Sequence, residues 1–282
     1  MITELDASWQ SWVKENIDRG CHKEELFKIM LDHQFDPKTI QSALNIKEIS
    51  PYLRGLIDND DIKHQSQLFN LPEAVFQNAI SVGGKNARAY IQPVFLSQEE
   101  CDQVIERIKK HLRPSLITSS NEPDKYFRTS KTCDLGIHTD DFIKYIDQKI
   151  ADYLGIDPAY SEVIQGQYYQ IGNEFKLHTD YFQPNSDEYN QFAARQGQRT
   201  WTFMIYLNDV EEGGHTDFPK LDLSVRPKTG SAVIWNSLDE NGKVNSNTLH
   251  WAKPILKGEK YVITKWFREN ADQTGKRTPN NV

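Results

Sequence analysis

Phe175-Lys176-Leu177-His178-Thr179-Asp180-Tyr181-Phe182 is a β-strand pattern in which a histidine and an aspartate stand two residues apart. Side chains two residues apart on a strand leave the same face, so this pair can bind one metal ion. With a second histidine from elsewhere, the pair would form the two-His, one-carboxylate arrangement that suits non-haem Fe(II). The stretch therefore predicts a metal centre, provided that the sequence around it supports one.

The tripeptide His-Thr-Asp occurs at 138–140, 178–180 and 215–217, so the pair alone is only weakly specific. The first copy precedes a helical pattern, and Thr139 or Asp140 is well placed to cap that helix. The third copy lies among glycines and a proline, which indicates a turn between strands. We therefore expect the middle copy to hold the metal.

Further strand patterns flank the middle copy. They are rich in β-branched and aromatic residues and are separated by Gly and Pro turns, which is typical of a sandwich or jelly roll. His250 precedes the last pattern and offers a distal imidazole, and Lys260 follows a Lys257-Gly258 turn that can fold the chain back toward the metal. The patterns span 163–169, 175–182, 200–207, 231–235 and 261–267.

These features together resemble the prolyl 4-hydroxylase branch of the Fe(II)/2-oxoglutarate-dependent dioxygenases. The resemblance covers about residues 88–269 and includes the upstream stretches 95–101 and Arg128-Thr129-Ser130. It implies an α+β fold, a double-stranded β-helix (jelly roll) with supporting helices. The positions that carry it are Tyr169, Gly172, His178, Asp180, Arg199, Thr202, 206–208, 212–214, 218–219, Gly230, His250 and Lys260.

The resemblance also implies a metal and a reaction. His178, Asp180 and His250 would bind Fe(II), with 2-oxoglutarate and O2 as co-substrates and ascorbate as a reductant. The reaction would hydroxylate an unactivated C–H bond, giving succinate and CO2. The branch favours C4 of a prolyl residue in a protein or peptide. Related branches hydroxylate other residues or free amino acids, and the metal motif does not distinguish them.

Three further residues would bind 2-oxoglutarate if the resemblance holds. Lys260 would pair with the distal carboxylate, Tyr169 would hydrogen-bond it, and Thr202 would assist. Physical reasoning supports the lysine, because a dicarboxylate inside a barrel needs a cation and donors to offset its burial. A buried lysine without such an anion would be equally unfavourable. No catalytic acid or base is required beyond the metal centre.

The segment 181–198 leaves the ligand strand directly and mixes polar with aromatic residues. We expect a lid that brings Tyr181, Tyr189 or Arg195 to the substrate, although a solvated excursion without such contacts is the alternative. Arg128 and Trp266 are two further candidates for contact with substrate, because both fit the prolyl branch.

Two other classes of function compete with the hydroxylase. A non-catalytic metal-binding scaffold would use its N-terminal helices to bind a partner, but it would not need an intact triad and Lys260. A zinc hydrolase with the same ligands lacks an obvious general base and leaves Lys260 without a role.

Composition limits the setting. The chain has 282 residues, 33 Lys+Arg and 40 Asp+Glu, hence a net charge of −7. This balance argues against nucleic-acid binding and permits a basic partner. There is no N-terminal apolar run, so we expect no signal peptide and no membrane span. Three widely spaced cysteines indicate reduced, buried or half-buried thiols and a cytoplasmic protein, which makes collagen an unexpected substrate.

The N-terminal third predicts a separate small all-α domain. A stripe from Trp9 to Ile17 ends at Gly20, a second runs from Leu26 to Met30, and a third follows Pro37. This bundle would pack on the barrel, dimerise or bind a partner. The expected divisions are a bundle over 1–50, a connector with some helix over 51–87, the jelly roll over 88–269 and a polar, frayed tail over 270–282.

Overall fold

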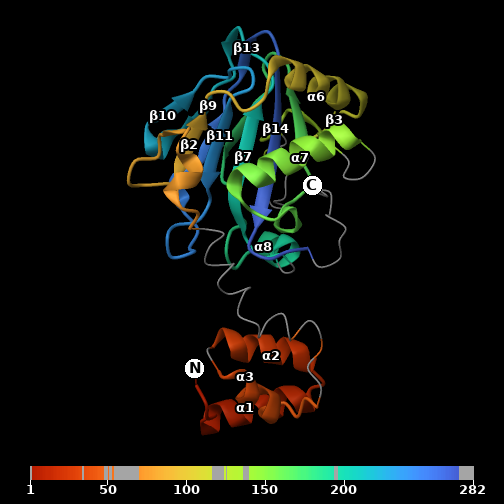
Figure 1. Ribbon diagram of the computed structural model, residues 1–282, viewed down its shortest axis with the longest axis vertical. Helices are drawn as coiled ribbons and strands as arrows, with labels where there is room; N and C mark the ends of the chain where they lie inside the picture. Colours follow the sequence, from red (N-terminus) through yellow and green to blue (C-terminus); the bar gives the residue numbers. More distant parts are fainter. Residues whose placement is uncertain are drawn as a thin grey trace. The chain divides into compact units, whose positions relative to one another are not determined.

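The computed structural model describes residues 2–33, 35–47, 50, 53, 70–115, 124, 126–135, 140–193 and 196–272 (Figure 1). The chain forms two compact units, Met1–Ser66 and Gln67–Val282. Each unit has its own hydrophobic core.

The first unit contains the three predicted helices, α1 (Ala7–Asp18), α2 (Lys23–Asp32) and α3 (Pro37–Ala43). Asp6 and Asp36 begin α1 and α3, and each side chain accepts hydrogen bonds from backbone N–H groups in the first turn. The apolar stripes face one another, as the sequence pattern indicated. The buried core consists of Val13, Leu26, Phe27, Met30, Phe35, Ile40, Leu44 and Leu53. Partner binding or dimerisation by this unit stays a prediction.

The second unit is built from antiparallel sheets, in agreement with the predicted jelly roll. The large sheet has the order β1 (Ile80–Ser81), β2 (Ala89–Gln92), β11 (Ala232–Asn236), β7 (Arg199–Tyr206), β14 (Lys260–Arg268), β5 (Gln165–Tyr169), β4 (Lys131–Asp134) and β3 (Arg113–Pro114). The smaller sheet has the order β10 (Leu223–Val225), β9 (Thr216–Phe218), β12 (His250–Ala252) and β6 (Phe175–His178), and a third pairs β13 (Ile255–Lys257) with β8 (Glu212–Gly213).

Helices α6 (Gln98–Lys110) and α7 (Asp141–Leu154) lie across one face of the large sheet (Figure 1). Ser97 and Glu100 form a capping box at the start of α6, and the Asp140 side chain caps α7 as predicted. Gly155 ends α7 at a φ of 67°, a conformation that favours glycine. The short helices are α8 (Asp187–Phe192), η1 (Glu73–Phe76), η2 (Pro158–Tyr160), η3 (Pro219–Leu221) and η4 (Ser246–Thr248).

The central strands divide their side chains between two environments, as the two-residue period of a strand requires. Trp201, Phe203 and Ile205 of β7 pack toward the helices, whereas Met204 and Tyr206 pack with residues of the smaller sheet. The space between the two sheets therefore contains the inward-facing residues of β5, β7 and β14. The functional cavity lies there.

Two expectations about the ends of this unit need correction. Residues 70–87 are not a connector, because Leu71 and Phe76 are buried in the main core and β1 pairs with β2. The tail begins in ordered structure, since the Asp272 N–H donates to the Ala159 carbonyl at 2.8 Å. Most of the remaining connector and tail, 51–52, 54–69 and 273–282, lies outside the described residues.

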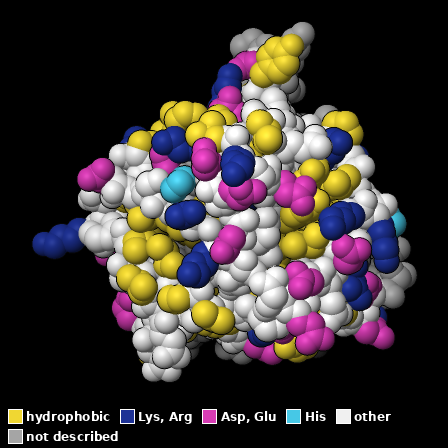
Figure 2. Space-filling model, turned by 90° about the horizontal axis from the view of Figure 1, so that it is seen from above, with side chains coloured by type: hydrophobic (Ala, Val, Ile, Leu, Met, Phe, Trp, Pro, Cys, Tyr) yellow, Lys and Arg dark blue, Asp and Glu magenta, His cyan; other side chains and the backbone are white. Residues whose placement is uncertain are grey.

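The state of the cysteines and the distribution of surface charge agree in part with the predictions. All three cysteines are free, and Cys101 and Cys133 are buried, but Cys21 is exposed rather than half-buried. On the face in Figure 2, the described basic and acidic side chains are interspersed rather than gathered by sign. Within the described residues, no helix has both the length and the apolar character needed to span a membrane.

Candidate metal centre

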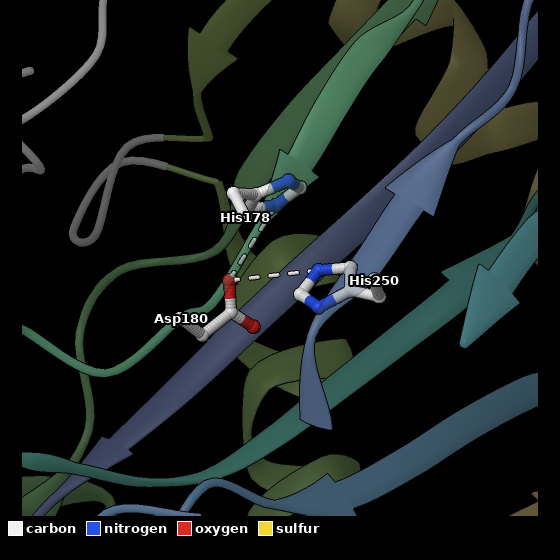
Figure 3. Close-up of side chains that lie close together, drawn as sticks. All are labelled: His178, Asp180 and His250. Atoms are coloured by element: carbon white, nitrogen blue, oxygen red, sulfur yellow. Dashed lines mark ion pairs between the residues drawn. The ribbon is translucent and has the colours of Figure 1, made fainter. Parts of the chain in front are cut away.

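Three side chains converge where the smaller sheet faces the cavity (Figure 3). The antiparallel pairing of β12 with β6 sets His250 opposite His178. Asp180 lies two residues beyond the end of β6, so the strand is shorter than the expected 175–182. Asp180 Oδ1 lies 4.0 Å from His178 Nε2 and 3.9 Å from His250 Nε2. One ligand atom from each residue lies within 4.8 Å of the others, so the three can hold a single metal ion.

Hydrogen bonds fix the direction in which each ligand points. His178 Nδ1 lies 2.7 Å from the Lys176 carbonyl oxygen, and His250 Nδ1 lies 2.9 Å from that of Thr248. These contacts place the proton on Nδ1 and leave both Nε2 atoms to face Asp180 as acceptors. Burial, with the neighbouring His250, holds the pKa of His178 well below its usual value, so the imidazole is neutral.

The carboxylate is oriented in the same way. The Thr202 hydroxyl donates to Asp180 Oδ2 at 2.6 Å, which leaves Oδ1 toward the two imidazoles. Aromatic rings hold the histidines from the sides: Phe175 stacks on His178 with ring centroids 3.5 Å apart, and Trp235 lies edge-on to His250 at 4.9 Å. The ligands are therefore placed before any metal binds.

Lys260 lies in the same cavity, and its ammonium has few polar partners among the described residues. It is the first residue of β14 and is 1% exposed. Its ammonium donates to the Gly214 carbonyl at 2.9 Å and lies 4.4 Å from the centre of the Tyr169 ring. Among the described residues no carboxylate pairs with it, and burial lowers its pKa to about 7. A buried cation in this situation is well suited to a ligand carboxylate.

The cavity also contains unpaired donors. The indole N–H groups of Trp235 and Trp266 are buried in its wall, and neither has a hydrogen-bond partner among the described residues. A ligand rich in oxygen acceptors would satisfy such groups. The donor set of the triad suits Fe(II). The buried Lys260 cation suits a carboxylate of a ligand.

The predicted site residues divide into those that line this cavity and those that do not. Tyr169, Arg128 and Trp266 line it together with His178, Asp180, His250 and Lys260. Thr202 contacts Asp180 rather than the open space, so its predicted role toward 2-oxoglutarate stays a prediction.

The segment 181–198 is more compact than a solvated excursion. It contains α8, and the Gln198 side chain bonds the Phe182 backbone at both N–H and carbonyl, which ties the two ends together. Tyr181 is buried and Tyr189 half-buried, but neither lines the cavity. Arg195 lies outside the described residues. Contact with substrate by this segment stays a prediction.

The other two His-Thr-Asp copies have different roles. His138 and Thr139 lie outside the described residues, whereas Asp140 caps α7 and pairs with Arg107. In the third copy the expected turn is only partly right, because Thr216-Asp217-Phe218 forms strand β9. Asp217 pairs with Lys253 at 2.9 Å, so this carboxylate forms an ion pair and is not a metal ligand.

Sequence reasoning missed a set of polar residues inside the barrel. Gln165 and Gln167 are buried on β5, and Thr264 is buried on β14. The signal was present, because Gln165, Gln167 and Tyr169 follow one another at the two-residue spacing of a single strand face.

Comparison with known proteins agrees with this geometry. A model of the 2OG-Fe(II) oxygenase superfamily matches residues 164–268. "Probable prolyl 4-hydroxylase 3" of Arabidopsis thaliana is 34% identical over 202 residues, which cover 64% of this chain and 69% of that relative. The chain belongs to the 2OG-Fe(II) oxygenase superfamily.

Two further matches place this oxygenase near the prolyl hydroxylases. Prolyl 4-hydroxylase 13 of Arabidopsis thaliana is 30% identical over 247 residues, covering 80% of this chain and 85% of the relative. The viral collagen prolyl hydroxylase of Paramecium Bursaria Chlorella virus-1, solved as a 2OG complex, superposes with a TM-score of 0.51 at 27% identity. That match covers 66% of this chain and 97% of the viral chain. The protein is thus a prolyl 4-hydroxylase-like oxidoreductase.

Proposed function

We propose that this oxygenase hydroxylates C4 of prolyl residues in a peptide or protein. One observation carries the enzymatic part: the two-His, one-carboxylate triad and the unpaired Lys260 cation line one buried cavity. Support for proline comes from the relatives, which are named prolyl 4-hydroxylases at about 30% identity. Arg128 and Trp266 in the cavity wall are the proposed contacts for the peptide.

The residues of this chain would divide the work among them. His178, Asp180 and His250 would hold Fe(II), and Thr202 would keep the Asp180 carboxylate in position. Lys260 would bind the distal carboxylate of 2-oxoglutarate, while the buried aromatic walls exclude water. When bound, Fe(II) with 2-oxoglutarate and O2 supplies the oxidation that turns C–H into C–OH, with succinate and CO2 as co-products. Ascorbate is the proposed reductant that restores Fe(II).

The first test is binding without turnover. Fe(II) and then 2-oxoglutarate are added anaerobically to the whole protein, and the visible metal-to-ligand charge-transfer band is recorded. We expect a band in the wild type, no band in His178→Ala, and 2-oxoglutarate affinity about 100-fold weaker in Lys260→Met, as for loss of a buried charge pair. His215→Ala is the matched control and should retain the band, as should His138→Ala. A folded wild-type protein without a band would refute the oxygenase chemistry.

The second test concerns the substrate. Proline-containing peptides are incubated with the Fe(II)-loaded protein, 2-oxoglutarate, ascorbate and air, and succinate and peptide mass are followed together. A gain of one oxygen on proline, matched by succinate, is expected. An oxygen gained on another residue, or on free amino acids alone, would move the activity to a related branch.

A further inference from the structure

A chain of polar side chains follows the inner face of β5. The Arg128 guanidinium donates to Gln165 Oε1 at 2.7 Å, and Gln167 Nε2 donates to the same oxygen at 3.3 Å. At the other end of Gln167, its Oε1 accepts from the Tyr169 hydroxyl at 2.8 Å. Arg128, Gln167 and Tyr169 all line the cavity, so the chain runs beside the space that a ligand would fill.

The chemistry of Arg128 sets the direction of every bond in this chain. A guanidinium only donates, so the Gln165 oxygen must face it. The Gln167 amide must then present its NH2 group to that oxygen and its carbonyl to Tyr169. The Tyr169 hydroxyl therefore donates its single proton to Gln167. Thr264 Oγ1 accepts the second Gln167 donor at 3.2 Å, so both ends of this amide are engaged.

This direction matters for the predicted role of Tyr169. A phenol has one proton, so Tyr169 cannot donate to 2-oxoglutarate while it donates to Gln167. If the ligand takes the proton, the buried Gln167 carbonyl loses its partner, and the amide must turn to recover one. Turning the amide removes the donor that shares the Gln165 oxygen with Arg128. Ligand binding beside Lys260 and Tyr169 therefore alters the hydrogen bonding of the Arg128 guanidinium.

We propose that Gln167 is a positioning residue that couples 2-oxoglutarate binding to the placement of Arg128, the candidate contact for the peptide. The inference rests on the proposed function, since it takes 2-oxoglutarate as the ligand beside Tyr169. The coupling is reciprocal, because linkage between two sites acts equally in both directions. Occupancy of the co-substrate site would thus prepare the side chain that meets the peptide.

A double-mutant cycle tests the coupling without any knowledge of the peptide. The Fe(II)-loaded whole protein is titrated anaerobically with 2-oxoglutarate, and binding is read from the charge-transfer band and from tryptophan fluorescence. Four proteins are compared: wild type, Arg128→Met, Gln167→Met and the double variant. We expect Arg128→Met to change the affinity by about 5-fold in the wild-type background and by less than about 2-fold when Gln167 is Met.

A matched control uses a cation outside the cavity. Arg113 lies on β3 and pairs with Asp134 at 2.8 Å, so Arg113→Met should act additively with Gln167→Met. If Gln167→Met does not fold, Gln165→Met interrupts the same chain one link earlier and takes its place in the cycle.

Each outcome shows whether Gln167 couples the 2-oxoglutarate site to Arg128. Additive effects of Arg128→Met and Gln167→Met, or no effect of Arg128→Met on 2-oxoglutarate affinity, would overturn the coupling and leave the oxygenase intact. Absence of 2-oxoglutarate binding in the wild type would instead overturn the proposed function. A non-additive cycle beside an additive control would establish Gln167 as the link.

Discussion

Lys260 and Lys265 are both buried on strand β14, but they occupy opposite faces of it. Lys265 faces the helices, is 0% exposed and donates to Asp147 at 2.5 Å and to Ser161 at 2.6 Å. Lys260 faces the cavity, where one backbone carbonyl among the described residues accepts from its ammonium. A buried charge that is paired within the protein, such as Lys265, contributes to the stability of the fold. A buried charge without a carboxylate partner, such as Lys260, is available to bind a ligand.

Removing each charge in turn tests whether the two lysines differ in this way. Lys265→Met should lower the free energy of unfolding by about 3 kcal/mol, because Asp147 would lose its cation in a mostly buried position. Lys260→Met should leave it within about 1 kcal/mol of the wild type or raise it, because no anion is stranded. Urea unfolding of the metal-free protein measures both, with Lys265→Met/Asp147→Asn as the control that restores part of the loss. Equal losses in the two single variants would show that the two lysines do not differ.

Two threonines on one face of β7 also differ in whether they contact the metal site. Thr202 bonds Asp180, whereas the buried Thr200 hydroxyl has no hydrogen-bond partner among the described residues. Thr202→Val should weaken Fe(II) binding about 10-fold, as for loss of a group that orients a metal ligand. Thr200→Val should leave it unchanged. Competition for Fe(II) with a chelator measures both, and equal effects would mean that the Thr202 hydroxyl does not position the carboxylate.

The smallest expected effect is a pH dependence that Lys260 imposes and Lys265 does not. Burial lowers the pKa of Lys260 to about 7, and only the protonated form attracts a carboxylate. The affinity for 2-oxoglutarate should therefore fall as the pH rises above 7, by about 5-fold between pH 7 and pH 8. Anaerobic titration at each pH measures this.

The control is Lys260→Met, which should bind weakly but with a flat profile over the same range. A wild-type affinity that is constant from pH 7 to pH 8, or one that rises, would contradict the role of the Lys260 ammonium.

Two of the three metal ligands could be predicted because they are close in sequence. His178 and Asp180 belong to one strand pattern, and the helical pattern after the first copy indicated Thr139 or Asp140 as its cap, of which Asp140 caps α7. Several strand patterns indicated a sandwich or jelly roll. The double-stranded β-helix and the roles of His250 and Lys260 were implied by the family resemblance. The strand and cap patterns need only local periodicity, which the sequence shows directly.

Pairings between distant strands were not visible in the same way. Nothing local indicates that Lys265 meets Asp147 of α7, or that the pattern around Ile80 pairs with β2 instead of forming a connector. Similarly, Thr216 became part of a strand because β10 and β12 flank it, although its glycine neighbours indicated a turn. Tertiary partners decide such cases, and local propensity does not.

The facing positions of His178 and His250 on paired strands also bear on how such an enzyme can be altered. A strand that slips by one residue turns each side chain to the opposite face, so a single insertion or deletion within β6 or β12 would separate the ligands. The tied segment between Phe182 and Gln198 carries no such register. The two ligand strands must therefore be inherited as an unbroken pair, whereas a change of length in that segment leaves their pairing in place.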